Sequence, residues 1–103
     1  MTANALRGEA SLNIAGKPVL IRPTFEALLA AEEELGSLFG VMERAASGSL
    51  RLGEIVALFD HLSASRPSQI GRNEIGAAVA SQGLAAVTPI LRIVLSQILK
   101  GSE

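Results

Sequence analysis

The sequence predicts an α+β fold, in which an N-terminal β-hairpin is followed by a bundle of about four to five short helices. Two observations support this prediction. Before Pro23 apolar and polar residues alternate as in a half-buried strand, and after Pro23 apolar residues recur at helical spacing. A length of 103 residues suits one compact domain. We therefore expect residues 1–103 to form a single domain, with the hairpin at about residues 8–22 and the helical part at about residues 24–100.

The hairpin is predicted from two short runs of strand-forming residues. Residues 9–14 alternate between polar and apolar side chains, and residues 19–21 are β-branched or apolar. Gly16, between the two runs, can adopt the positive φ that a tight turn requires. Because a lone hairpin is only marginally stable in water, we expect it to pack on the helices. Leu20 and its neighbours are apolar on both faces, a pattern that fits a sheet with or without a third strand.

Five helical segments follow the hairpin. Thr24 is the expected N-cap of the first helix, with Glu26 in its first turn and Gly36 just past its end. Residues 63–68 are predicted to form a loop, because they are rich in serine and include Pro67. The predicted helices cover about residues 25–35, 37–46, 52–62, 73–82 and 84–100.

Glu32 has an unusual predicted position. At 100° per residue it projects close to Phe25, in the middle of the apolar face of its helix. A carboxylate there needs a cation, backbone donors or a proton. We favour a structural pair, with Arg22 or another arginine as the partner, over a functional carboxylate, because no second acid or base accompanies Glu32. Glu33 and Glu34 are expected on the solvated side of the same helix.

Catalytic chemistry has little support in the sequence. His61 is the only histidine and Asp60 the only aspartate, with Ser63 and Ser65 close by. Adjacent side chains on a helix point in different directions, so this run does not make a catalytic triad by itself, and we place Asp60 and His61 on the polar surface of their helix. A single histidine without cysteine makes a poor transition-metal site. We therefore predict that the chain is not an enzyme and has no metal site and no cofactor.

Composition and charge argue against several further classes. The absence of cysteine excludes disulfide frameworks and thiolate metal sites. Nine basic residues against ten acidic ones argue against a nucleic-acid partner. The most apolar stretch, residues 84–99, is interrupted by polar side chains and is shorter than the roughly 20 residues that span a membrane. Because the N-terminus lacks a signal-peptide pattern, we expect a cytoplasmic protein without a membrane partner.

The last predicted helix has more apolar surface than a surface helix needs. Its apolar residues cover roughly two thirds of the circumference. Either the helix lies at the centre of the bundle, or another chain covers part of it. The polar residues form a narrow ridge with a period of four: Thr88, Arg92, Ser96 and Lys100. The candidate partner-binding residues, which would face another protein or a second copy of the chain, are Ile93, Leu95 and Leu99.

The N-terminal third resembles a known family. The resemblance is carried by Arg7-Gly8-Glu9 at the start of a strand, Gly16 at the turn, Leu20-Ile21-Arg22-Pro23-Thr24-Phe25 before the first helix, and then Glu32 and Gly36. These residues resemble the small tail-assembly chaperone family encoded by gene transfer agents and related tailed phages, which is also described as a phage tail tube protein family. Structural roles are expected for Arg22, Pro23, Thr24, Phe25 and Glu32.

The resemblance implies a non-enzymatic protein of virion tail morphogenesis without a cofactor. Such a chaperone binds a tape-measure or other tail protein in the host cytoplasm and keeps its apolar segments soluble until the tail assembles. The alternative is a minor structural component of the particle, such as part of the tail tube. One predicted hairpin counts against the tube, because tube rings need long β-sheets. A small enzyme with a pocket around Glu32 or His61 is the least favoured alternative.

Overall fold

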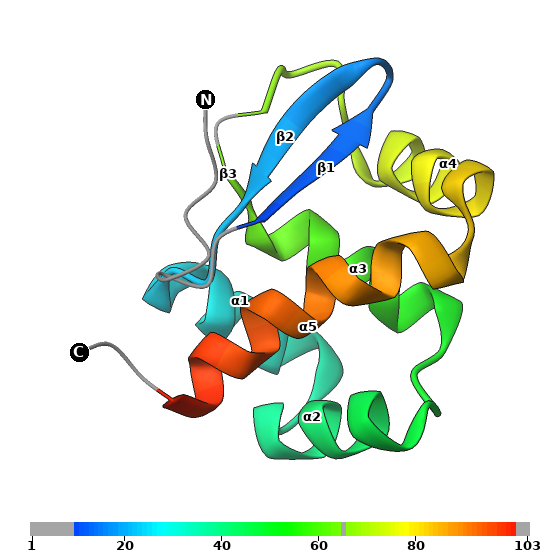
Figure 1. The fold of residues 1–103 in the computed structure, drawn as a ribbon. Helices are drawn as coiled ribbons and strands as arrows, with labels where there is room; N and C mark the ends of the chain where they lie inside the picture. The colour runs from blue at the N-terminus through cyan, green and yellow to red at the C-terminus, as the bar shows by residue number, and fades with distance from the viewer. Residues whose placement is uncertain (1–9, 65, 101–103) are drawn as a thin grey trace.

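A small antiparallel sheet lies across a group of five helices (Figure 1). The computed structural model describes residues 10–64 and 66–100, and of Ala64, Leu99 and Lys100 it describes the backbone only. The Arg7-Gly8-Glu9 segment and the predicted start of the hairpin at residue 8 lie outside the described residues. Within the described part the predicted α+β fold is confirmed.

The sheet has three strands in the order β1-β2-β3. β1 (Ala10–Ile14) and β2 (Lys17–Ile21) form the predicted hairpin, and β3 (Ser63–Ala64) pairs with the other edge of β2. The loop predicted at residues 63–68 is therefore wrong at its first two residues. Its serine-rich composition suggested a loop, but the tertiary fold brings this segment to β2, where the Arg22 N–H donates to the Leu62 carbonyl at 2.7 Å.

Five helices follow the hairpin, and local signals set the ends of the first one. Thr24 Oγ1 accepts a hydrogen bond from the Ala27 N–H at 3.2 Å, which makes Thr24 the N-cap, as predicted. Gly36 ends the helix with a φ of 89°, a value that favours glycine. The helices are α1 (Phe25–Leu35), α2 (Leu38–Ser47), α3 (Leu52–Leu62), α4 (Arg72–Gln82) and α5 (Leu84–Lys100). Each bound lies within one residue of its predicted position.

The hairpin buries one face and exposes the other. Along β1 the buried residues Ala10, Leu12 and Ile14 alternate with exposed Ser11 and Asn13, as the period of two predicts. β1 packs against α5 and α4, which supply the support that a lone hairpin lacks. The Gln82 side-chain amide of α4 also donates to the Asn13 carbonyl at 2.6 Å. This contact satisfies a backbone acceptor of a strand at the edge of the sheet.

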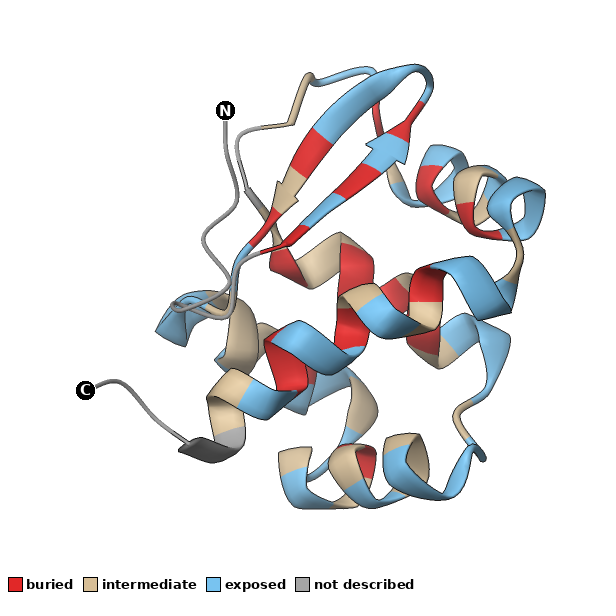
Figure 2. Cartoon of the chain, viewed as in Figure 1, coloured by how far each residue is buried: buried red, intermediate tan, exposed pale blue. Residues whose placement is uncertain are grey.

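Helix α3 lies at the centre of the core. It packs against α1 and α4, and the segment after it continues into the sheet. Its buried residues are Ile55, Ala57, Leu58, Phe59 and Leu62. Figure 2 shows the buried segments gathered where α3, α5 and the inner face of the sheet meet. Helix α2 lies at the end of the molecule away from the sheet, and Val41 is the one buried residue in it.

The turn between β1 and β2 consists of two residues with positive φ, 53° at Ala15 and 80° at Gly16. Two positive φ values are the pattern of a type I′ turn, whose twist matches that of the flanking strands. Glycine adopts this conformation freely. An alanine pays about 1–2 kcal/mol there because its Cβ crowds the backbone.

Replacement of Ala15 by asparagine should stabilise the protein by about 0.5–1 kcal/mol, because asparagine tolerates a positive φ and Asn-Gly is a preferred type I′ pair. Thermal unfolding followed by circular dichroism should show a Tm that is higher by several degrees. Ala15→Val is the control and should lower the Tm, since a β-branched side chain is strained further at this φ. A lower Tm for Ala15→Asn would mean that the turn has another conformation in solution.

Candidate functional site

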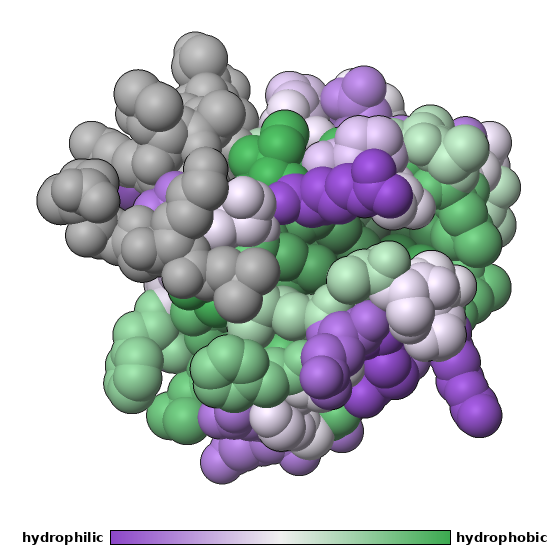
Figure 3. Space-filling model, turned by 60° about the horizontal axis from the view of Figure 1, so that its bottom comes forward, coloured by the Kyte–Doolittle hydropathy of each residue, from purple (hydrophilic) through white to green (hydrophobic). Residues whose placement is uncertain are grey.

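An apolar groove lies between α2 and α5. It consists of two adjoining hollows of about 380 and 220 Å³, which share part of their lining. We call them together the α2–α5 groove. Figure 3 shows the groove as a hollow with an apolar floor across the middle of this face. The lining comes from α2 (Met42, Ala45, Ala46), from α5 (Leu84, Thr88, Leu91, Arg92, Leu95, Ser96) and from Gly48, Leu50 and Ile55.

The groove exists because α2 is attached to the rest of the fold on one side. α2 packs against α1 and places its buried residue, Val41, away from the groove lining. The side chains that α2 presents toward α5 include Ala45 and Ala46, which are too small to fill the space between the helices. The floor is nevertheless well packed, since Ile55, Leu91 and Leu95 are buried. The α2–α5 groove is thus open to solvent, and the residues beneath it are packed in the core.

The three predicted partner-binding residues of α5 do not share one exposed face. Ile93 is 40% exposed, whereas Leu95 is 6% exposed and forms part of the groove floor. That these residues contact a partner therefore stays a prediction, although Leu95 lies at the floor of an open groove. Two residues that are two positions apart lie about 200° apart around a helix, so Ile93 and Leu95 point in nearly opposite directions. The side chain of Leu99 lies outside the described residues.

Helix α1 buries a different side from the predicted one. Its buried residue is Ala31, while Phe25 is 77% exposed. Glu32 is exposed rather than embedded in an apolar face, so that prediction is wrong. Its carboxylate accepts a hydrogen bond from the Leu38 N–H at 3.2 Å, at the first residue of α2. A carboxylate at a helix N-terminus is favourable, and Glu32 thus helps to set the start of α2.

The residues that precede α1 occupy the junction between sheet and helices. Arg22 is bonded through its backbone to the end of α3, Pro23 is half-buried, and Thr24 caps α1. These positions explain the Arg-Pro-Thr-Phe run as a structural connection. Phe25 is the exception in the run, because its ring is exposed and is not part of the buried core.

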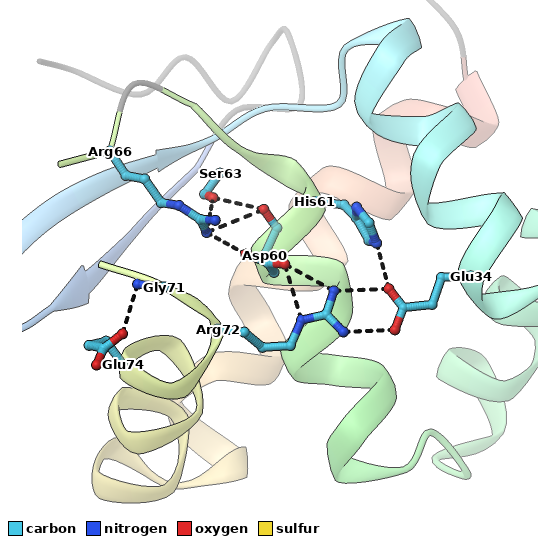
Figure 4. A network of polar contacts seen from close by, with 8 residues as sticks. All are labelled: Glu34, Asp60, His61, Ser63, Arg66, Gly71, Arg72 and Glu74. Atoms are coloured by element: carbon cyan, nitrogen blue, oxygen red, sulfur yellow. Dashed lines mark hydrogen bonds and ion pairs between the residues drawn. The ribbon is translucent and has the colours of Figure 1, made fainter. Parts of the chain in front are cut away.

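The second candidate site is a cluster of polar residues that joins three helices, with Arg72 at its centre (Figure 4). The Arg72 guanidinium binds both carboxylate oxygens of Glu34, at 2.7 and 2.9 Å. It also contacts Asp60 Oδ2 at 2.9 and 3.1 Å. His61 Nε2 lies 2.7 Å from Glu34 Oε1, and Arg66 Nη1 lies 2.6 Å from Asp60 Oδ1, at an angle outside the usual hydrogen-bond range. We call these five residues the Arg72 network.

The Arg72 network extends one prediction and corrects another. Glu34 is exposed, as predicted for the polar side of its helix, but it is not merely solvated, since it connects α1 to α3 and α4. Asp60 and His61 were expected on an exposed polar surface, but their side chains are only 17% and 20% exposed. The polar side of α3 is the side on which α1 and α4 pack. α1 carries Glu34 and α4 carries Arg72, and these charged side chains compensate the loss of solvation of His61 and Asp60.

The contacts of the Arg72 network keep its carboxylates charged. Hydrogen bonds from Arg72 and then from His61 lower the pKa of Glu34 to about 2, from an ordinary value of 4.5. Burial acts to raise the pKa of Asp60, but the contacts with Arg66 and Arg72 outweigh it, and the pKa is lowered overall. The hydrogen bond to Glu34, followed by that to Asp60, raises the pKa of Arg72. These charges serve an ion-pair network and not proton transfer near neutral pH.

The same geometry separates Asp60, His61 and Ser63 of the suggested catalytic run, and Ser65 lies outside the described residues. His61 faces Glu34, and Ser63 Oγ donates to the Asp60 carbonyl at 2.9 Å and accepts from Arg66 at 2.8 Å. A nucleophile next to a base is therefore not formed by these residues. In residues 10–64 and 66–100, no three side chains of ligand type are grouped to hold a metal ion. The Arg72 guanidinium occupies the space between the two carboxylates.

The helices were also compared with the length and hydropathy of membrane spans. Over the described residues, no single helix is long and apolar enough to cross a membrane. Residues 72–82 and 84–98 reach that length only as a pair, and they meet at a bend of 118°.

The fold and the α2–α5 groove define a small α+β domain with an open apolar surface. Comparison with protein families gives its relationship: residues 7–101 match the family described as phage tail tube protein, GTA-gp10. The match covers nearly the whole chain, and the chain belongs to this family. Neither the curated proteins nor the solved structures compared with it gave a match. The family resemblance inferred from the N-terminal third is confirmed by this match.

Replacement of Glu34 by glutamine should change how stability depends on pH. Because folding lowers the pKa of Glu34 from 4.5 to about 2, the charged carboxylate stabilises the fold above about pH 4.5, and this stabilisation is lost as the pH falls toward 2. The difference in unfolding free energy between wild type and Glu34→Gln should be constant near neutral pH and shrink below pH 4.5. Urea unfolding at a series of pH values measures it.

The matched control for this experiment is Glu33→Gln. This variant removes a neighbouring charge from the same helix but retains Glu34. Its unfolding free energy should therefore still fall below pH 4.5, as that of the wild type does. A stability difference for Glu34→Gln that does not change between pH 7 and pH 2 would contradict the described Arg72–Glu34 contact.

Proposed function

We propose that this chain is a non-enzymatic component of a phage-like tail, and that it binds another tail protein through the α2–α5 groove. The observation that carries the proposal is an open apolar groove in a member of a phage tail protein family. Support also comes from the Arg72 network, whose charged side chains are all engaged in holding helices together. The groove, by contrast, is open and apolar, as a protein-binding surface would be.

The family description favours a role inside the finished tail. In this role the chain remains in the particle as a minor component associated with the tail tube. A tube wall built from this chain alone has less support, because β3 has two residues and β1 and β2 have five each. Rings that share long sheets need more strand than this. A second protein would then provide most of the wall.

A second candidate is the transient role of a tail-assembly chaperone in the host cytoplasm. It is favoured by the exposed aromatic side chains of α1 and α2, since Phe25 is 77% exposed and Phe39 is 74% exposed. Large apolar groups on a surface mark sites for other proteins. An apolar helix of a tape-measure protein is a suitable partner, because it would be insoluble until the tail forms. The same groove serves in both roles.

The two roles differ in where the chain is found after assembly. Mass spectrometry of purified particles measures whether it is retained. A tail component should be present at a fixed ratio to the other tail proteins, whereas a chaperone should be found only in the lysate before assembly. If tails form normally in cells that lack the chain, both roles are wrong.

The substitution Ala46→Lys should disable the groove without unfolding the protein. Ala46 is exposed and lines the groove, so a lysine there places a charged chain where an apolar partner would lie. Cells that produce only this variant should form at least about tenfold fewer complete tails, counted by electron microscopy, because covering a charged side chain with an apolar partner costs more than about 1.4 kcal/mol.

Ala80→Lys is the matched control. Ala80 is an exposed alanine on α4, outside the groove lining, and its replacement should leave tail numbers unchanged. Both variants should unfold at the wild-type Tm within a few degrees. Equal tail numbers for Ala46→Lys and wild type would remove the groove from the proposed function.

A further inference from the structure

We propose that the α2–α5 groove binds an amphipathic helix of another tail protein, and that an acidic side chain on one edge of this helix pairs with Arg92. This inference rests on the proposed function and specifies the chemistry of the partner. Three features of the groove lead to it: an arginine without a described partner, walls made of helices, and two rims of different polarity.

Arg92 differs from three other arginines of the fold. Arg44, Arg66 and Arg72 each lie within 2.6–2.9 Å of a carboxylate oxygen. Arg92 is exposed and lines both hollows of the groove, yet among the described residues no hydrogen bond or ion pair is found for it. A guanidinium beside an apolar surface is a ready partner for a carboxylate, with which it can form two parallel hydrogen bonds. The positive charge of Arg92 thus favours a partner that places an acidic side chain beside it.

The walls of the groove indicate a helical partner. Both α2 and α5 use their backbone groups within the helices, so the groove offers side chains and no free strand edge. On α2, the residues Phe39, Met42 and Ala46 follow a spacing of three and four and lie on one stripe. Phe39 is 74% exposed, which extends this apolar wall beyond the groove lining. Small residues such as Ala45 and Ala46 allow the backbone of another helix to approach closely.

The two rims set the orientation of the acidic group. The α5 rim is polar: Arg92 lies between Thr88 and Ser96, one helical turn away on either side. The α2 rim is apolar at Phe39, and Glu43 lies next to it, about 60° around the helix from Ala46. An acidic residue would be repelled by Glu43 and attracted by Arg92. The partner helix therefore needs an apolar stripe with its acidic residue on the edge that faces α5.

Two synthetic peptides test this inference with the full chain. Each has about 18 residues, enough to form a helix, with leucine and alanine along one stripe and uncharged polar residues elsewhere. They are identical except that one has glutamate and the other lysine at the edge of the stripe. Isothermal titration should give the glutamate peptide an affinity about tenfold higher than that of the lysine peptide, since attraction replaces repulsion. Amide signals of Met42, Ala46 and Leu95 should shift in NMR spectra on binding.

Charge reversal at Arg92 provides the decisive comparison. Arg92→Glu should invert the preference, so that the lysine peptide binds more tightly. Lys17→Glu makes the same change of net charge at an exposed residue of β2, outside the groove, and should leave the preference as it is. Equal affinity for the two peptides, no binding of either, or the same inversion in both variants would overturn the inference. Self-association that disappears in Arg92→Glu would overturn it too, because a second copy would then fill the groove.

The outcomes separate this inference from the proposed function. If the peptides bind as expected while cells without the chain build normal tails, the proposed function is wrong and the groove chemistry stands. If the chain is required for tails but the peptides do not bind at the groove, the proposed function stands and the acidic-helix partner is wrong.

Discussion

The burial of α3 is the constraint on which the rest of the fold depends. Phe59 is fully buried and its neighbours Leu58 and Leu62 nearly so, which means that other elements must cover this helix on several sides. The same helix carries Asp60 and His61, whose polar groups need partners once α1 and α4 pack over them. Apolar covering and charge pairing are thus achieved by the same two helices.

The position of α2 follows from this arrangement. Since α1 and α4 cover α3 and α5 supports the sheet, α2 is left at the edge of the fold and attaches mainly to α1. It fixes its start through Glu32 and buries a single residue, Val41. Because α2 contributes only one buried residue to the core, it does not pack closely against α5. The α2–α5 groove is the space that remains between the two helices. The Arg72 network connects α1, α3 and α4 apart from the groove lining, and α2 has its own ion pair to α3, between Arg44 and Glu54 at 2.6 Å.

Local parts of the fold could be predicted from the sequence, and parts that depend on tertiary contacts could not. The hairpin and the helix ends follow from signals within a few residues, such as Gly16, Thr24 and Gly36. The hydrogen-bonded ion pair between Glu34 and Arg72 joins residues 38 positions apart, and no local sequence pattern predicts it. The buried side of α1 was misjudged because Phe25 and other large apolar residues dominate the helical pattern, whereas small Ala31 is the residue that enters the core. The low exposure of Leu95 could not be predicted, because the sequence of an apolar helix in a core does not reveal which of its sides stays open.

The α2 wall of the groove has a consequence for how such a protein diverges. Met42, Ala45 and Ala46 line the groove, and none of them belongs to the buried core or to the Arg72 network. A substitution at these positions would reshape the proposed recognition surface and change the stability of the fold little. Selection can therefore track changes in a partner on α2 while α3 and its covering helices stay constant. Under the proposed function, variation confined to α2 would let chains with this fold bind different tail proteins.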